Sequence, residues 1–184
     1  MRDRVPFSNR SRGGKRDVVP GLAMSKIRSF NSLLRIVRQA RASGRRIVFT
    51  NGCFDLLHAG HVALLEQARQ RGDLLVVGLN SDRSVRRLKG PGRPIVRERD
   101  RALVLAGLAS VSYVTLFNEA TPERLIARLR PEVLVKGADW PSANIVGRDL
   151  VRRHGGRVVR IPLRKGYSTS RLIERIRCCL ASRG

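Results

Sequence analysis

Two histidines, His58 and His61, give the clearest chemical signal in the sequence, where they bracket the segment HAGH. This segment follows a predicted strand, 46–51, and opens a predicted helix, 60–71, so both imidazoles should lie on one helical face. The start of a helix presents free N–H groups and the positive end of its dipole, which favour an anion. Gly60 has no side chain to keep a phosphate away from the backbone. The pattern predicts a phosphate-binding cradle.

Two other roles for these histidines stay open at this stage. A single histidine near a helix start is often structural and bonds a backbone carbonyl. With Cys53 and Asp55 the pair could also form a zinc site, although a third ligand would have to be in place beside an anion-binding helix end. Cys53 alone is more typical of a small buried residue than of a nucleophile.

Further phosphate-binding features follow other predicted strands. Lys89 is flanked by glycines that would let a loop close, and lysine is scarce beside arginine in this chain, which favours a function over a merely solvated side chain. Lys136 and Gly137 end a predicted strand and add a cation at the same sheet edge. The segment YSTS, 167–170, offers hydroxyls and N–H groups to phosphate before the last helix, although a plain N-cap explains any one of them.

Strand and helix patterns alternate along the chain. Predicted strands cover 46–51, 73–79, 111–117, 132–136 and 157–161, and predicted helices cover 29–41, 60–71, a short stretch from Ser81, 98–108, 121–129, 143–153 and 169–180. The runs VVGL and VLVK are continuously apolar, as expected when helices cover both faces of a parallel sheet. The predicted fold is α/β, a doubly wound parallel sheet. Such sheets bind ligands at the carboxyl ends of their strands, where the motifs above lie.

The chain divides into three predicted regions. Residues 1–24 are basic, aperiodic and poor in apolar residues, which predicts a disordered tail, although a biological start at Met24 stays open. Residues 25–44 hold an N-terminal helix whose apolar face should pack on the domain. Residues 45–184 form that domain, which has room for a single active site.

The charge and the cysteine content limit which binding partners and which cellular compartment are expected. Lys and Arg number 38 against 14 Asp and Glu, a net charge of +24 that attracts phosphates and nucleic acid. Nucleic-acid contact through the tail is therefore an alternative, against which stands the low aromatic content available for base stacking. Three cysteines without a pairing or metal-binding pattern fit a reducing compartment, and no apolar run reaches the ~18 residues that span a membrane. We expect a cytoplasmic protein without membrane contact.

Five segments in this order resemble one known family. They are TNGCFDLLHAGH, GLNSDRSV, RLKGPGRPI, VKGADW and GYSTSRLIERI, and they span roughly residues 28–180. They are similar to the cytidylyltransferase-like nucleotidyltransferases, whose hallmark is HxGH after the first strand, and within them to the adenylyltransferase domains of ADP-heptose synthases. Class I aminoacyl-tRNA synthetases share a related motif, but the chain looks too short for one. STS stands here where the wider family often has STT, which keeps the hydroxyls.

The resemblance implies a Rossmann-like fold and transfer of AMP from ATP to D-glycero-β-D-manno-heptose 1-phosphate, giving ADP-heptose and pyrophosphate for lipopolysaccharide core synthesis. A cytidylyltransferase for glycerol 3-phosphate or a related phosphate is the nearest alternative. A nucleic-acid-binding protein on an inactive enzyme scaffold is an alternative of another class. ATP would act as substrate with Mg²⁺, for which no protein ligand is named. A homodimer stays open, and a separate kinase would have to supply the sugar phosphate.

The resemblance also implies the site residues. The expected catalytic residues are His58, His61 and Lys89. Expected at the nucleotide, beside the two histidines, are Thr50, Asn51, Gly52, Phe54, Lys136, Gly137, Asp139, Ser168, Thr169 and Ser170, with Trp140 in the same segment as Asp139. Expected at the sugar phosphate are Asp55, Asn80 and Lys89; Asp55 could hold the sugar or a magnesium-bound water, or simply cap the turn into the helix.

Overall fold

The sheet holds five parallel strands, as predicted for a doubly wound α/β protein. The structure, a computed structural model, describes residues 21–138, 141, 144–162, 164 and 166–182. The strands lie in the order β3-β2-β1-β4-β5. In chain order they are β1 (Ile47–Gly52), β2 (Leu74–Asn80), β3 (Tyr113–Phe117), β4 (Val133–Gly137) and β5 (Arg157–Ile161). This is the strand order of a Rossmann-like fold.

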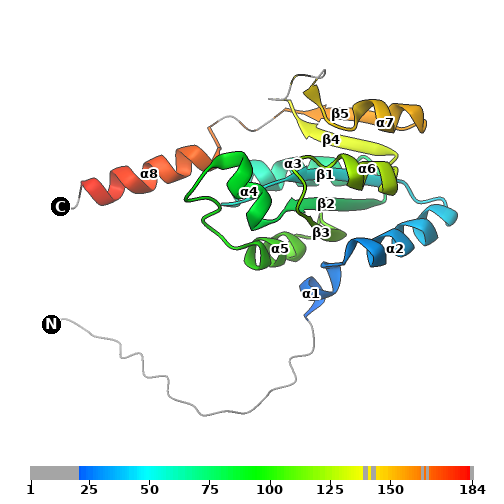
Figure 1. Cartoon of the computed structure of the whole chain (residues 1–184), viewed down its shortest axis with the longest axis horizontal. Helices are drawn as coiled ribbons and strands as arrows, with labels where there is room; N and C mark the ends of the chain where they lie inside the picture. The colour runs from blue at the N-terminus through cyan, green and yellow to red at the C-terminus, as the bar shows by residue number, and fades with distance from the viewer. Residues whose placement is uncertain (1–20, 139–140, 142–143, 163, 165, 183–184) are drawn as a thin grey trace, which may run out of the picture.

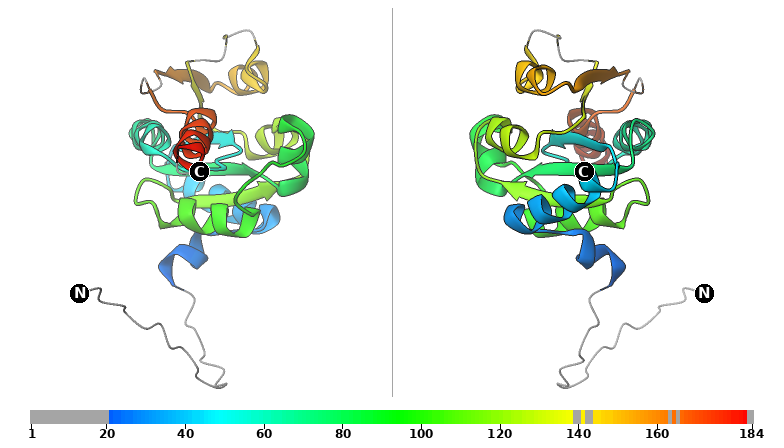
Figure 2. Two further views of the ribbon diagram at one scale, coloured as in Figure 1. Left: turned by 90° about the vertical axis from the view of Figure 1, so that its left-hand side faces the viewer. Right: turned by 90° about the vertical axis from the view of Figure 1, so that its right-hand side faces the viewer.

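Helices cover both faces of the sheet (Figures 1 and 2). One face carries α2 (Phe30–Ala42), α6 (Glu123–Leu129) and α7 (Arg148–Arg153), and the other carries α3 (Ala59–Arg69) and α5 (Glu98–Gly107). Two further helices, α4 (Asp82–Lys89) and α8 (Thr169–Ala181), begin at the edge where the strands end. There α8 extends away from the sheet, and none of its residues is buried. Among the described residues, no helix is long and apolar enough to cross a membrane.

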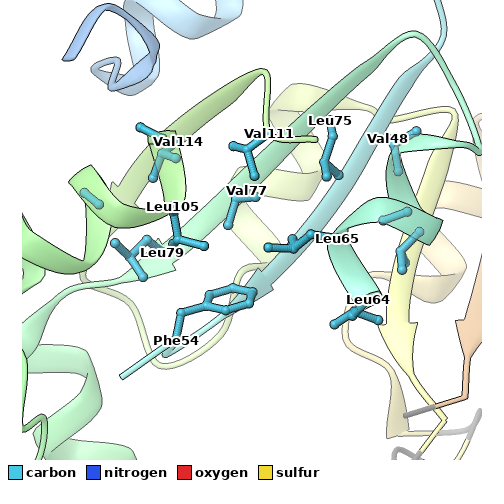
Figure 3. Close-up of a cluster of buried hydrophobic side chains, with 14 of the residues drawn as sticks. Val48, Phe54, Leu64, Leu65, Leu75, Val77, Leu79, Leu105, Val111 and Val114 are labelled. Atoms are coloured by element: carbon cyan, nitrogen blue, oxygen red, sulfur yellow. The ribbon is translucent and has the colours of Figure 1, made fainter. Parts of the chain in front are cut away.

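The core consists of two aliphatic clusters, one on each side of the sheet. Successive strand residues point to opposite faces, so Val48 belongs to the cluster that includes residues of α3 and α5, while Ile47 and Phe49 belong to the cluster that includes residues of α2 and α6. Figure 3 shows the first cluster, in which Leu65 of α3 and Leu105 of α5 meet the strands. Burial on both faces is the physical reason that the strands read as continuous apolar runs.

Two boundaries differ from the sequence predictions. A short helix that was not predicted, α1 (Leu22–Lys26), crosses the expected boundary at residue 24, and Lys26 Nζ donates to Leu108 O at 3.1 Å. The predicted helix 143–153 is shorter, since α7 begins only at Arg148, after Gly147 adopts a left-handed φ of 86°. The predicted tail lies largely outside the described residues, because residues 1–20 are not among them.

The strand order reverses between β1 and β4, and this reversal opens the sheet at its carboxyl edge. The β1–β2 ladder runs the full length of β1, from Ile47 to Gly52. The β1–β4 ladder pairs only Val48 with Val133 and Phe49 with Leu134. Beyond these pairs the two strands no longer form a ladder, which is where doubly wound sheets bind their ligands.

Candidate active site

The turn from β1 into α3 has an unusual backbone that places the histidines. Phe54 adopts a positive φ of 44°, which is uncommon for a residue other than glycine. Its ring is buried in the core cluster beneath the turn, as Figure 3 shows, and meets the ring of His61 edge-on with centroids 5.2 Å apart. A side chain at Gly52 would approach the Phe54 ring to 3.0 Å. The aromatic ring thus anchors the turn to the core and supports one imidazole.

His58 and His61 lie together at the start of α3. His58 is the N-cap residue and His61 is in the first turn, with their rings stacked at a centroid distance of 3.8 Å and an interplanar angle of 17°. The Nδ1 atoms of both rings are buried and have no hydrogen-bond partner among the described residues. Buried polar atoms are normally paired, so two unpaired atoms on stacked rings mark this turn as a candidate ligand site. A structural bond to a backbone carbonyl is not seen for either Nδ1.

Burial keeps both imidazoles neutral. Desolvation lowers the pKa of His61 from 6.5 to about 4, with a smaller contribution from the neighbouring His58. The pKa of His58 is lowered as well, mainly by desolvation, against an opposing backbone hydrogen bond. An arriving polyanion would favour the charged forms and raise both values. The pair can therefore supply neutral N–H donors or, beside phosphate, imidazolium ions.

At Gly60, in the first turn of α3, neighbouring side chains approach the backbone closely. A Cβ atom there would lie 3.0 Å from His58 Nδ1 and 3.1 Å from the Cβ of Tyr167. The approach of Tyr167 brings the segment before α8 to the histidines, with the Tyr167 and His58 ring centroids 6.1 Å apart. Thr169 Oγ1 donates to Leu56 O at 3.4 Å, which fixes the start of α8 to the same turn. Two helix N-termini thus converge, as the sequence suggested.

The opening between β1 and β4 is bridged by side chains. Lys136 Nζ, at the end of β4, donates to Asn51 Oδ1 at 2.5 Å and to Asn51 O at 3.4 Å. Gly137 follows and is buried. The structure brings these three predicted nucleotide residues together at the carboxyl edge, where a cation beside the switch point can meet a phosphate.

Lys89 stands at the end of α4, in front of a glycine-containing loop. Its side chain is exposed, and Gly90 and Gly92 adopt left-handed φ values of 87° and 80° that favour glycine. A cleft of about 500 Å³ separates this loop from α8 and is lined by Arg93 and Ser170 among others. The loop thus forms one wall of the cleft on the side that faces α8.

Asp55 anchors the far end of that loop. Its carboxylate, from a residue only 3% exposed, accepts from Arg93 Nε at 2.6 Å and from the backbone N–H groups of Ile95 at 2.8 Å and Val96 at 3.0 Å. It does not cap the turn into α3, which was one prediction. Its expected role at the sugar stays a prediction, but its oxygens are already used by the loop.

The other predicted site residues are placed as follows. Thr50 and Asn80 are 1% and 3% exposed, and the Asn80 amide donates to Ser84 Oγ at 2.9 Å, so neither side chain lines an open surface in this structure. Ser168 caps α8 by accepting from Arg171 N at 3.2 Å. Asp139 and Trp140 lie outside the described residues.

Arg101 is a residue of the site region that sequence reasoning missed. It is 1% exposed, and its guanidinium bonds Cys53 O, Asn80 O, Val96 O and the Asp82 carboxylate. A signal was available, because Arg101 stands four residues before buried Leu105, on the apolar face of α5. A charged side chain on a buried helix face needs a partner, so the sequence already indicated that Arg101 bonds groups from other segments.

A zinc centre at the histidines has no support in the described part of the chain. No group of three or more His, Cys, Asp and Glu side chains there could hold a metal ion. The cysteine in the turn, Cys53, is half-buried, and desolvation raises its thiol pKa. The one nearby carboxylate that could hold a metal, Asp55, is bonded by the loop. Phosphate chemistry is the reading that this geometry favours.

Comparison with known proteins shows the family to which the chain belongs. Residues 49–175 match the family described as cytidylyltransferase-like, from β1 to the first half of α8. The chain belongs to this family. It is a nucleotidyltransferase with a Rossmann-like fold.

Its relatives within this family include larger proteins. The bifunctional protein HldE of Syntrophotalea carbinolica is 55% identical over 152 residues, covering 83% of this chain and 31% of the relative. HldE of Alkalilimnicola ehrlichii is 60% identical over 144 residues, covering 78% of this chain and 30% of the relative. The chain thus spans about a third of the length of the curated relatives that it matches.

Two solved structures share the fold. The lipopolysaccharide core biosynthesis protein of Thermoplasma volcanium has a TM-score of 0.57 and 28% identity, covering 66% of this chain and all of that one. Pantoate-beta-alanine ligase of Francisella tularensis, complexed with β,γ-ATP and β-alanine, has a TM-score of 0.56 and 13% identity, covering 76% of this chain and 67% of that one. The second likeness concerns the fold alone.

Proposed function

We propose that the chain transfers AMP from ATP to D-glycero-β-D-manno-heptose 1-phosphate, giving ADP-heptose and pyrophosphate. The observation that carries phosphate chemistry is the stacked His58–His61 pair, with both Nδ1 atoms buried and unpaired among the described residues. The identity to HldE proteins, 55% and 60% in the two cases above, supports the nucleotide and the sugar. The relative named for lipopolysaccharide core biosynthesis supports the same pathway.

The reaction needs positioning more than proton transfer. An oxygen of the sugar phosphate attacks the α-phosphorus of ATP, and the bond from that phosphorus to the bridging oxygen breaks, so pyrophosphate leaves with the electron pair. The attacking phosphate is already an anion at neutral pH, so no base has to remove a proton. The difficulty is to hold two polyanions together and to stabilise charge on the transferring group. The positive field of a chain with a net charge of +24 lowers that barrier to encounter.

The predicted site residues divide this work. His58 and His61 would donate to the phosphates and to the departing pyrophosphate from the N-terminus of α3. Lys89 would follow the phosphates on its loop, while Lys136 and Asn51 would meet the nucleotide at the β1–β4 opening. Ser168, Thr169 and Ser170 would offer hydroxyls from the start of α8. Mg²⁺ would arrive with ATP as part of the substrate and reduce its charge.

Pyrophosphate release tests the proposal directly. The purified chain is given MgATP or MgCTP with heptose 1-phosphate or glycerol 3-phosphate, in all four combinations. We expect turnover with ATP and heptose 1-phosphate, with the product confirmed as ADP-heptose by mass spectrometry. Turnover confined to CTP with glycerol 3-phosphate would replace the proposal with the cytidylyltransferase alternative. No turnover in any arm, together with salt-dependent retention of nucleic acid, would favour the inactive scaffold.

The substrate must come from another reaction. A sugar 1-phosphate arises from transfer of a phosphoryl group to the anomeric position, and the relatives that are named bifunctional are about three times as long as the matched region. We propose that a sugar kinase supplies it. A homodimer and a cytoplasmic location stay predictions.

A further inference from the structure

Arg101 connects four parts of the chain around the candidate site. Its Nη1 donates to Cys53 O at 2.5 Å, in the turn before the histidines, and to Asn80 O at 2.9 Å, at the end of β2. Its Nε donates to Val96 O at 2.9 Å, and its Nη2 pairs with Asp82 Oδ1 at 2.7 Å. The side chain is 0% exposed. One guanidinium therefore joins the turn, a strand end, a loop end and a helix start.

Fold stability alone is a weak reason for this arrangement. Burying a guanidinium carries a desolvation cost that roughly offsets its ion pair and hydrogen bonds, and replacing a whole buried ion pair by apolar residues is often neutral or stabilising. Three of the four acceptors are neutral or backbone groups, and the fourth, Asp82, is itself partly exposed. What the guanidinium does provide is fixed geometry, because its planar donors hold several acceptors at set angles.

The segment that Arg101 holds is the one that carries Lys89. Asp82 lies in the first turn of α4, whose last residue is Lys89, and Val96 lies at the far end of the loop that follows. Arg101 thus grips both ends of residues 82–96 and ties them to the turn at Cys53. Asp55, in the same turn, holds the loop a second time through Arg93.

Charges from this segment converge on the turn. The cations Lys89, Arg101 and Arg93, in that order, each act to lower the pKa of the Cys53 thiol, against the larger opposing effect of burial. Each of these side chains thus lies near enough to the Cys53 thiol to act on it electrostatically, which agrees with the hydrogen bonds that tie this segment to the turn.

We propose that Arg101 is a positioning residue that sets the place of the Lys89 loop relative to the histidine turn. Through Asp82 and Val96 it holds α4 and the loop, and through Cys53 O it holds the turn, so that Lys89 reaches the phosphates bound at His58 and His61. This inference rests on the proposed function for the role of Lys89. The clamp itself rests only on the hydrogen bonds above.

The test compares Arg101 with a matched arginine. Arg41 also pairs with one carboxylate, Glu132, and donates to two carbonyls, of Leu129 and Arg130, but it lies at the opposite edge of the sheet. The variants are Arg101→Lys, Arg101→Met, Arg41→Lys and Arg41→Met. Steady-state kinetics use ATP with heptose 1-phosphate, and hydrogen exchange by mass spectrometry reports on residues 82–96 with and without MgATP.

For Arg101→Lys we expect kcat to fall about 100-fold with KM for ATP changed less than about threefold, because misplacing a catalytic group by ~1 Å costs about this much in rate. Amide exchange should quicken in residues 82–96. The Arg41 variants should leave kcat and exchange in this segment unchanged, whatever thermal stability the variants at either site lose. If the role of Arg101 were only structural, substitutions at both sites would lower thermal stability, and Arg101→Lys would not lower kcat selectively over KM for ATP.

A double-mutant cycle decides whether Arg101 acts through Lys89. If it does, Lys89→Ala should cost about 100-fold in the wild type but less than about fivefold in the Arg101→Lys background, because the lysine is already misplaced. An undiminished effect of Lys89→Ala in that background overturns the positioning role. So does an Arg101→Lys variant with full kcat.

Failure of the proposed function would look different. If the wild type turns over none of the four substrate combinations, the activity is wrong, yet the exchange measurement still tests the clamp. Faster exchange of residues 82–96 in Arg101→Met than in Arg41→Met then supports the clamp, and equal exchange overturns it.

Discussion

The two edges of the sheet differ in how completely their polar groups are paired. At the amino edge Glu132 accepts from Arg41 and from the backbone N–H of Ile47, and Asp73 accepts from the N–H of Arg46. At the carboxyl edge the Nδ1 atoms of His58 and His61 are buried without a partner among the described residues. Asp55, Asn80 and Arg101 at the carboxyl edge are also paired within the protein, so the two imidazole Nδ1 atoms are the exception there, as expected of groups that meet a ligand.

Left-handed backbone occurs at both edges. At the amino edge Gly44, Arg130 and Gly155 have positive φ values, and at the carboxyl edge Phe54 and the glycines of the Lys89 loop do. Strained or left-handed positions persist where the surrounding structure over-determines them, which is common at functional sites. Buried Arg101 and Asp55 supply that over-determination at the carboxyl edge. Substitutions at the two edges should therefore separate activity from stability.

The largest effect on activity should come from the histidines. We expect His58→Ala and His61→Ala each to lower kcat about 100- to 1000-fold, the usual loss when one donor to a transition state is removed. The measurement is pyrophosphate release with ATP and heptose 1-phosphate. The control is His154→Ala, since His154 is exposed and bonds only Leu150 O among the described residues. Near-normal kcat in both site variants would remove the basis of the proposed chemistry.

Lys89 should matter for turnover and hardly at all for stability. Its side chain is exposed, so Lys89→Met should leave the melting temperature within a degree or so, while kcat falls about 100-fold through loss of one phosphate donor. Lys26→Met is the control, because Lys26 lies in α1 and its Nζ donates to Leu108 O. A Lys89 variant with unchanged kcat would show that the lysine is only a solvated side chain.

The unpaired histidine should make stability depend on pH. The pKa of His61 is about 4 in the folded protein and about 6.5 when unfolded. Between these values the unfolded chain binds a proton that the folded protein does not, so stability is complete above pH 6.5 and falls as the pH drops toward 4. Denaturant unfolding of His61→Gln should show a weaker fall over this window than the wild type. Equal slopes would mean that His61 is not held neutral by burial.

The smallest effect on activity is expected at the amino edge. Glu132→Ala leaves the N–H of buried Ile47 and the Arg41 guanidinium without their acceptor, so the free energy of unfolding should drop by about 1–3 kcal/mol. The kcat should stay within twofold, because no bond of Glu132 reaches the carboxyl edge. Denaturant unfolding measures the loss of stability and pyrophosphate release measures kcat, both on one preparation of the variant. A loss of kcat without a loss of stability would contradict the division between the edges.

Much of the fold could be predicted because its signals are local. Strand 157–161 agrees with β5, and Ser81 and Ser29 cap their helices by accepting from the N–H groups three residues on. The errors were local too. The helix predicted from 143 begins later, since a left-handed Gly147 ends any continuous helix there, and α1 is too short for a periodicity signal.

The candidate site was predicted only in part, for a physical reason. A motif such as HAGH is contiguous, so residue types and spacing disclosed the histidines and the N-terminus of α3. The partners of Asp55 and the roles of Phe54 and Arg101 depend on contacts between distant segments; Arg101 and Cys53, for example, are 48 residues apart. Spacing along the chain carries no information about such pairs.

By itself, the sequence determined the alternation of strands and helices, the parallel sheet and the place of the HAGH motif at a strand end, because hydrophobic periodicity and capping act over a few residues. The tertiary structure alone decided that the two imidazoles stack with unpaired Nδ1 atoms, and that the Asp55 carboxylate serves the loop. It also decided that a buried arginine ties the Lys89 loop to the histidine turn. Those outcomes depend on which surfaces the packed sheet brings together, and burial then sets the cost of every polar group left between them.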